Sequence, residues 1–182
     1  MQKDDDLIRE IVDFWFSDEV SPKWFNSTPE FDELLRQHYE KVWGLARAGT
    51  YDHWENEAES ALALVLILDQ FPLNMFREQA RQYSTEAHAR KVAAQAIELG
   101  LDQALTKPQR AFLYLPFMHS ESMEDQNRSV ELYEKAGLKD NLVYARHHRD
   151  VIIRFGRFPH RNAVLGRTST PEEVEYLKKA RW

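Results

Sequence analysis

Apolar residues recur along the chain at the three- and four-residue spacing of amphipathic helices, and the alternation typical of strands is scarce. Thr28 followed by Pro29, and Thr170 followed by Pro171, each predict a helix start, because threonine caps the first turn and proline suits its first position. Glu173 is expected to complete a capping box with Thr170. Helices are predicted over residues 7–15, 29–49, 60–70, 84–100, 109–115, 122–137, 140–155 and 170–177, with capping residues and terminating glycines included. The chain is therefore predicted to be all-α, with about eight helices in antiparallel hairpins joined by short connections.

The segment 60–70 differs from the other predicted helices because it is apolar on nearly every side. Alanine and leucine dominate it, which predicts a helix buried in the core. Pro72 is expected to end this helix, and Pro116 the helix at 109–115, because proline lacks an N–H group and clashes with the preceding turn. No linker or low-complexity stretch interrupts the pattern, which predicts a single domain over residues 1–182.

The composition removes several classes of function. The chain has no cysteine, so disulfides, thiolate metal sites and cysteine nucleophiles are excluded. Its start is acidic and its longest apolar run, residues 61–68, is too short to span a bilayer, so we expect a soluble, cytoplasmic protein. The net charge of −6 argues against a general nucleic-acid binder, although residues 146–167 contain six arginines and only one acid, Asp150.

The turn that follows the helix at 140–155 is the strongest candidate for a site. Gly156 permits a left-handed conformation, and Pro159 stiffens the chain after it. The residues nearby that can donate hydrogen bonds to an anion are Arg154, Arg157, His160, Arg161 and Asn162. Arginine binds a carboxylate or phosphate through two hydrogen bonds, which favours an anion site. The same cations could instead satisfy the carbonyl groups at helix ends.

A second polar group follows the apolar run 112–118 and consists of His119, Glu121, Asp125 and Gln126. Glu121 and Asp125 are four residues apart, so they lie on one face if this turn is helical. The group could perform acid–base chemistry, or hold a metal through carboxylates and imidazole. Alternatively, its acids favour the positive end of a helix that Ser122 caps.

The predicted helix at 140–155 places His147, Asp150 and Arg154 on one stripe. This stripe could form the wall of a cleft, or a network of ion pairs between helices. The adjoining stripe, which is expected to face the core, contains Tyr144, His148, Val151, Ile152 and Phe155.

Polar residues also follow the apolar segment 60–70. Asp69 and Gln70 end it, and Asn74 and Arg77 come on the next turn. A buried carboxylate needs a cationic partner, and the arginines of 146–167 are the expected source. These residues could complete the cleft, or form a buried pair that holds two helix hairpins together.

Long motifs in the chain resemble one known family. They are residues 12–16 (VDFWF), 68–72 (LDQFP), 112–121 (FLYLPFMHSE), 125–126 (DQ), 154–162 (RFGRFPHRN) and 165–170 (LGRTST). On these motifs the chain is similar to the bacterial domain of unknown function 924 family. The resemblance implies an all-helical fold similar to tetratricopeptide repeats, and it brings no established activity or cofactor with it. The chain departs from the family pattern at Leu73, where arginine is usual, and at Glu78, where glycine is usual.

Two functions fit these patterns. The first is a cleft that binds a small anionic molecule, in which His119, Glu121, His147 or His160 would act as acid or base if the protein is an enzyme. Hydrolysis is then the least specific reaction, and the sequence assigns no metal ligands and no cofactor. The second is a helical scaffold that presents a concave surface to a protein or peptide partner. RNA binding through residues 146–167 is the least favoured function, because the chain as a whole is acidic.

Overall fold

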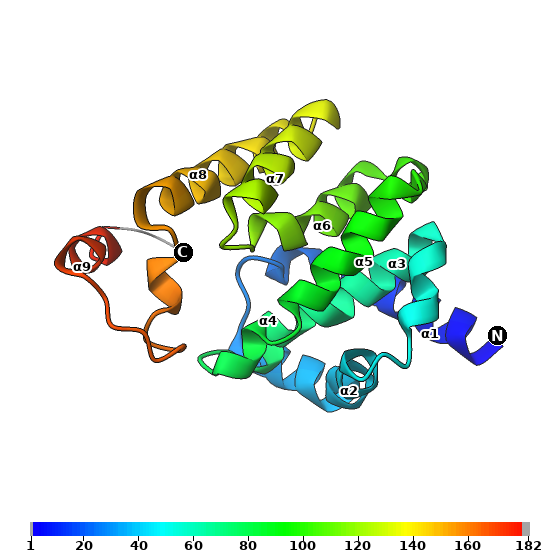
Figure 1. The fold of residues 1–182 in the computed structure, drawn as a ribbon. Helices are drawn as coiled ribbons and strands as arrows, with labels where there is room; N and C mark the ends of the chain where they lie inside the picture. The colour runs from blue at the N-terminus through cyan, green and yellow to red at the C-terminus, as the bar shows by residue number, and fades with distance from the viewer. Residues whose placement is uncertain (1, 180–182) are drawn as a thin grey trace. The chain divides into compact units, whose positions relative to one another are not determined.

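The computed structural model describes residues 2–179 of the chain, and in that range it contains α-helices, short 3-10 turns and no strand (Figure 1). The α-helices are α1 (Gln2–Trp15), α2 (Pro29–Arg47), α3 (Ala58–Val65), α4 (Phe71–Met75), α5 (Glu86–Glu98), α6 (Lys107–Met118), α7 (Met123–Lys135), α8 (Lys139–Phe155) and α9 (Pro171–Leu177). The all-α prediction is therefore confirmed. None of these helices is long and apolar enough to cross a membrane.

The helices belong to two compact units. Unit 1 comprises Met1–Arg77 and Arg81–Pro116, and unit 2 comprises Glu78–Ala80 and Phe117–Trp182. Helix α6 therefore lies in unit 1 as far as Pro116, and its last two residues belong to unit 2. The single domain expected from the sequence, and its likeness to tetratricopeptide repeats, stay predictions.

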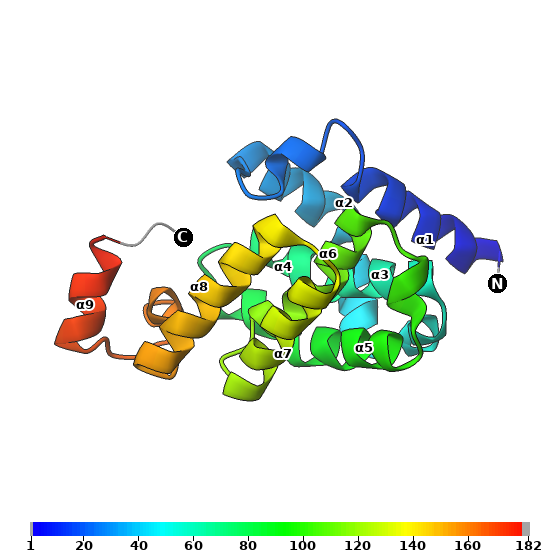
Figure 2. The same ribbon diagram turned by 90° about the horizontal axis from the view of Figure 1, so that it is seen from above.

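The core of unit 1 is built on α3, which packs against both α1 and α5, while α2 packs against α4 (Figures 1 and 2). Residues 61–68 have no solvent-exposed surface, which confirms the buried helix expected from their composition. Burial of a whole leucine or valine side chain contributes about 1.5 to 3 kcal/mol, so this segment supplies much of the driving force for folding unit 1.

The helical path does not end at Pro72, contrary to the expectation. A π-helical turn, Leu66–Gln70, follows α3, and α4 continues the helical path to Met75 with Pro72 in its first turn. A proline in this place leaves the carbonyl four residues before it without its helical donor. That carbonyl belongs to Leu68, and it accepts a hydrogen bond of 2.6 Å from the Thr85 hydroxyl. Pro116 likewise lies inside α6 and does not end it.

Unit 2 is a helix pair followed by a turn and a short helix. Helices α7 and α8 lie side by side, and α9 comes after the turn that ends α8 (Figures 1 and 2). Gly156 ends α8 with φ +69°, as its sequence position predicts, and Thr170 starts α9 with the expected capping box. A small core of Val151, Ile152 and Phe158 joins α8 to this turn, and Phe155 and Tyr176 pack against it.

Glu78 adopts the left-handed conformation, with φ +63°, at a position where the family that the chain resembles usually has glycine. A side chain costs about 1 to 2 kcal/mol there, whereas glycine costs about 0.5 to 1 kcal/mol through its extra freedom in the unfolded chain. We therefore expect Glu78→Gly to raise the free energy of unfolding by about 0.5 kcal/mol. Urea denaturation measures the change, and a fall in stability would show that Glu78 makes a compensating contact.

Candidate functional site

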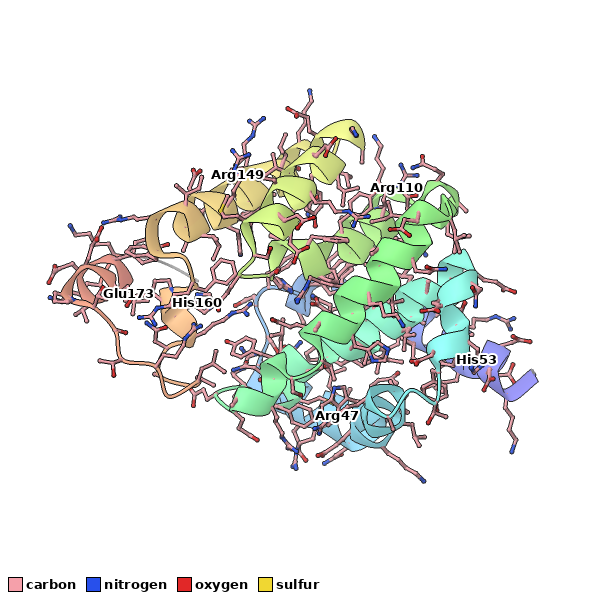
Figure 3. All side chains as sticks on the ribbon, viewed as in Figure 1. Arg47, His53, Arg110, Arg149, His160 and Glu173 are labelled. Carbon is pink, nitrogen blue, oxygen red and sulfur yellow. The ribbon has the colours of Figure 1, made fainter. Side chains whose placement is uncertain are left out.

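Arg157, on the turn after α8, forms an ion pair with the buried Glu173 of α9. Its Nε and Nη2 atoms donate to the two carboxylate oxygens of Glu173 at 2.7 and 2.8 Å. Glu173 also accepts hydrogen bonds from the Thr170 amide at 2.7 Å and from the Asn162 side chain at 3.2 Å. The hydrogen bond from Arg157 is the main reason that the pKa of Glu173 is lowered to about 2. Figure 3 labels Glu173 on α9, where this network ties the helix to the turn.

A second ion pair joins Arg167 to Glu121. Two hydrogen bonds of 2.7 and 2.9 Å connect the guanidinium to the carboxylate. Glu121 also accepts from the amide of Phe158 at 2.7 Å, and Arg167 donates to the Asn162 side chain at 3.0 Å. Burial raises the pKa of Glu121, but the bonds from Arg167 and Phe158 outweigh it, so the pKa lies below its usual value. The negative charge of Glu121 is therefore already balanced by Arg167 and bound by the Phe158 amide.

Asp125 and Gln126 stabilise the start of α7. The Asp125 carboxylate accepts a hydrogen bond of 2.6 Å from the Ser120 hydroxyl, which in turn accepts from the Ser122 amide at 3.2 Å. Gln126 is fully buried, and its amide donates to the carbonyls of Met118 and Ser120 at 2.7 Å each. Ser122 stands at the N-cap of α7 as expected, but its side chain makes no capping hydrogen bond, and the side chains of Ser120, Asp125 and Gln126 hold this turn instead.

Two histidines and an arginine surround the ring of Phe158, which is fully buried. The His148 ring lies 5.5 Å from that ring, edge to face, and the His160 ring lies 5.6 Å away. The guanidinium carbon of Arg161 is 4.8 Å from the same ring. Arg161 is only 6% exposed, and it donates a hydrogen bond of 2.8 Å to the backbone carbonyl of His119. We call His148, His160 and Arg161 the histidine–arginine cluster; His160 is labelled in Figure 3.

Both imidazoles of the histidine–arginine cluster are neutral near pH 7. Burial is the largest cause, and it lowers the pKa of His148 to about 4 and that of His160 to about 3. Arg161 and His119 lower both pKa values further, because a second positive charge nearby is unfavourable. His148 Nδ1 lies 2.8 Å from the carbonyl of Tyr144, so this nitrogen carries the proton and Nε2 holds the lone pair.

The two stripes expected on α8 differ in their exposure to solvent. His147, Asp150 and Arg154 are exposed to solvent, and Arg154 pairs with Glu172 at 2.7 Å. On the adjoining stripe Val151 and Ile152 are buried and His148 and Phe155 half-buried, as predicted. The prediction for Tyr144 was wrong, because this residue is 63% exposed near the start of the helix. Among the residues that the model describes, no three His, Asp or Glu side chains form a group that could hold a metal ion.

The remaining predicted site residues lie in unit 1. Asp69 and Gln70 are buried, and the Gln70 amide donates to the Asp69 carboxylate at 2.6 Å. Asn74 and Arg77 line a hollow between the start of α2 and the end of α4, with a volume of about 450 Å³. There Arg77 pairs with Asp32 of α2 at 2.6 Å.

Sequence reasoning assigned no site role to His148, Phe158, Asp32, Arg167 or Glu173. The helical spacing of His148 predicted a core residue. Its imidazole, a group that can bind an anion once protonated, is the feature that could have suggested a site role. Glu173 was recognised as half of a capping box with Thr170. Its bond to Arg157 spans 16 residues, and helix periodicity does not reveal such a contact.

The comparisons with known proteins agree with this fold. A family model described as "Bacterial protein of unknown function (DUF924)" matches residues 11–181. The chain is 43% identical to the solved structure of the protein of unknown function ATU0120 from Agrobacterium tumefaciens, with a TM-score of 0.90 over 96% of this chain and 98% of that chain. No curated protein matches the sequence.

Proposed function

The chain belongs to the DUF924 family of bacterial proteins of unknown function, so we propose a function from its geometry alone. We propose that unit 2 binds a small anion. The proposed site is the histidine–arginine cluster, and the ligand group is a carboxylate, sulfate or phosphate. The observation that carries the proposal is the position of one guanidinium and two neutral imidazoles around the single ring of Phe158.

The chemistry of these groups suits an oxyanion. A guanidinium presents several N–H donors in a planar fork that matches a carboxylate or phosphate. An imidazole that takes up a proton becomes a donor at both nitrogens, so His148 and His160 would add charge-assisted hydrogen bonds when an anion arrives. A protonated imidazole in this cluster needs a negative charge beside it, and a bound anion provides that charge. Binding of the anion is therefore coupled to proton uptake by the histidines.

Binding fits this site better than hydrolysis. A general base works best when its pKa lies near the working pH. With pKa values of about 4 and 3, His148 and His160 are weak proton acceptors at neutral pH. Glu121 is held by Arg167 and by the Phe158 amide, so it is not free to transfer a proton. Of the side chains proposed for acid–base work, His160 thus acts here as a ligand for the anion.

A scaffold for a peptide partner has less support. The large exposed apolar side chains of α8 are Val143, Tyr144 and Ile153, at 66%, 63% and 63% exposure. Tyr144 and Ile153 are nine positions apart, which puts them on opposite sides of a helix. They therefore give a peptide no single apolar stripe along α8.

Sulfate tests the proposal, because it keeps its charge across the pH range of interest. Calorimetry should show saturable binding to the whole chain, several-fold tighter at pH 5.5 than at pH 7.5, with protons taken up from the buffer. Arg161→Gln and His160→Asn should each weaken binding at least tenfold. Arg146→Gln is the matched control, because Arg146 is an exposed α8 arginine paired with Glu134. Equal affinity in Arg161→Gln and Arg146→Gln, or affinity independent of pH, would overturn the assignment.

A further inference from the structure

The hollow in unit 1 is separate from the histidine–arginine cluster, and it has its own chemistry. It opens between residues 27–36 at the start of α2 and Asn74, Met75 and Arg77 at the end of α4, and its volume is about 450 Å³. This volume is within the range of small-molecule sites, roughly 300 to 1,000 Å³. We call it the α2–α4 hollow.

Two ion pairs line the α2–α4 hollow. Arg77 holds Asp32 through two hydrogen bonds of 2.6 and 3.0 Å, and Arg36 holds Glu33 through its Nε at 2.9 Å. The Asp32 side chain is only 15% exposed although its partner Arg77 is 51% exposed, whereas Arg36 and Glu33 are 47% and 44% exposed. The acid of the first pair is thus sheltered from solvent, and both members of the second pair are accessible.

Neutral polar groups lie beside these charges. Asn74 is 7% exposed, and its side-chain oxygen accepts a hydrogen bond of 3.1 Å from Arg77. The Ser27 hydroxyl donates to Asp32 at 2.6 Å. Met75 and Pro29 add apolar surface to the wall. The lining therefore combines donors, acceptors and a short apolar face.

The charges of the lining decide which ligand it suits. The two guanidinium groups and the two carboxylates balance, so a simple anion or a simple cation meets as much repulsion as attraction. A molecule with one group of each sign can place its carboxylate on a guanidinium and its ammonium on a carboxylate. The two ion pairs formed with the ligand then replace the ion pair between the two side chains that they break.

We propose that the α2–α4 hollow is a binding site for a small zwitterion that carries one carboxylate and one ammonium group, such as a free amino acid. The ligand's ammonium contacts Glu33, the more exposed of the two acids, and its carboxylate contacts Arg36, the partner of Glu33. The Asp32–Arg77 pair and Asn74 form the fixed wall against which the rest of the ligand packs. Exposed ion pairs contribute little each, so the expected dissociation constant is in the millimolar range.

Titration of the ¹⁵N-labelled whole chain with β-alanine tests this proposal by NMR. The expected result is a saturable shift of the Asn74 side-chain amide and the Arg36 Nε signal. Acetate alone and ethylammonium alone, at the same concentration, should leave both signals in place. The variant Arg36→Gln should weaken β-alanine binding at least fivefold, and it should fold because Arg36 is exposed.

Arg47→Gln is the matched control, because Arg47 is an exposed arginine on the same helix and does not line the hollow. It should bind β-alanine like the natural chain. Three results would each overturn the proposal: acetate or glucose binding as tightly as β-alanine, no saturable shift up to about 50 mM, or equal loss in the two variants. None of them bears on sulfate binding to unit 2, because the histidine–arginine cluster shares no residue with this hollow.

Discussion

Replacing Glu173 with alanine is expected to destabilise unit 2 by about 3 to 5 kcal/mol, the largest effect of any single change proposed for this protein. Glu173 is 2% exposed, and its carboxylate accepts bonds from Arg157, Asn162 and the Thr170 amide. Its removal leaves these donors without their acceptor, and Arg157 without its counter-charge. For a chain of this size the change lowers Tm by about 10 °C, which calorimetric unfolding measures.

Glu172→Ala is the matched control for this prediction. Glu172 is the preceding residue with the same charge, but it is exposed and pairs with Arg154 on the surface. Its loss should cost at most about 1 kcal/mol, as expected for an exposed ion pair. If both variants lose the same small amount of stability, then the network around Glu173 is not what holds α9 to the turn.

Acidification is expected to destabilise unit 2 in a window set by two half-buried histidines, His148 and His160. Their pKa values in the folded chain, about 4 and 3, lie below the unfolded value of 6.5, so the unfolded chain binds more protons as pH falls. The contribution of both histidines is therefore complete above pH 6.5, and it falls from pH 6.5 to about 4 for His148 and to about 3 for His160. At 1.36 kcal/mol for each pKa unit, His148 alone accounts for about 3 kcal/mol of that loss. Urea denaturation of unit 2 at a series of pH values measures it.

The variant His148→Asn should remove about 3 kcal/mol of this pH dependence, since asparagine does not titrate, and should leave the part that His160 contributes. His38→Asn changes an exposed histidine of α2 and should leave the slope unchanged. Carboxylates act at lower pH: the pKa of Glu173 is lowered to about 2, so its contribution is complete above pH 4.5 and is lost below that value. A profile for the natural chain that stays flat from pH 6.5 to 4.5 would mean that the two imidazoles are not buried in the neutral form.

Local chemistry made much of the fold predictable. Thr28 and Thr170 cap α2 and α9 as expected, because a hydroxyl residue followed by proline favours a helix start. Pro72 misled because its effect depends on a distant residue. The Leu68 carbonyl that Pro72 leaves without its helical donor is satisfied by Thr85, and nothing in the sequence near Pro72 announces that partner.

The candidate site was harder to predict for the same reason. Residue types identified the turn at 154–162, but they did not reveal which arginines the fold already pairs. Arg157 meets Glu173 and Arg167 meets Glu121, and the second pair spans 46 residues. Such pairs depend on how the turn packs against α7 and α9, which periodicity along one helix does not encode. Arg161 donates instead to the backbone carbonyl of His119, and its guanidinium lies over the Phe158 ring.

The claim that the histidine–arginine cluster binds an anion is tested most directly by the protonation of its two histidine rings. NMR of ring-labelled protein can follow His148 and His160 from pH 7.5 downward, with and without sulfate. Without sulfate both rings should stay neutral down to pH 5.5, and saturating sulfate should raise both pKa values by at least two units, as the several-fold tighter binding at pH 5.5 requires. Rings that titrate near pH 6.5 in the free protein, or that do not respond to sulfate, would contradict a buried, anion-binding histidine–arginine cluster.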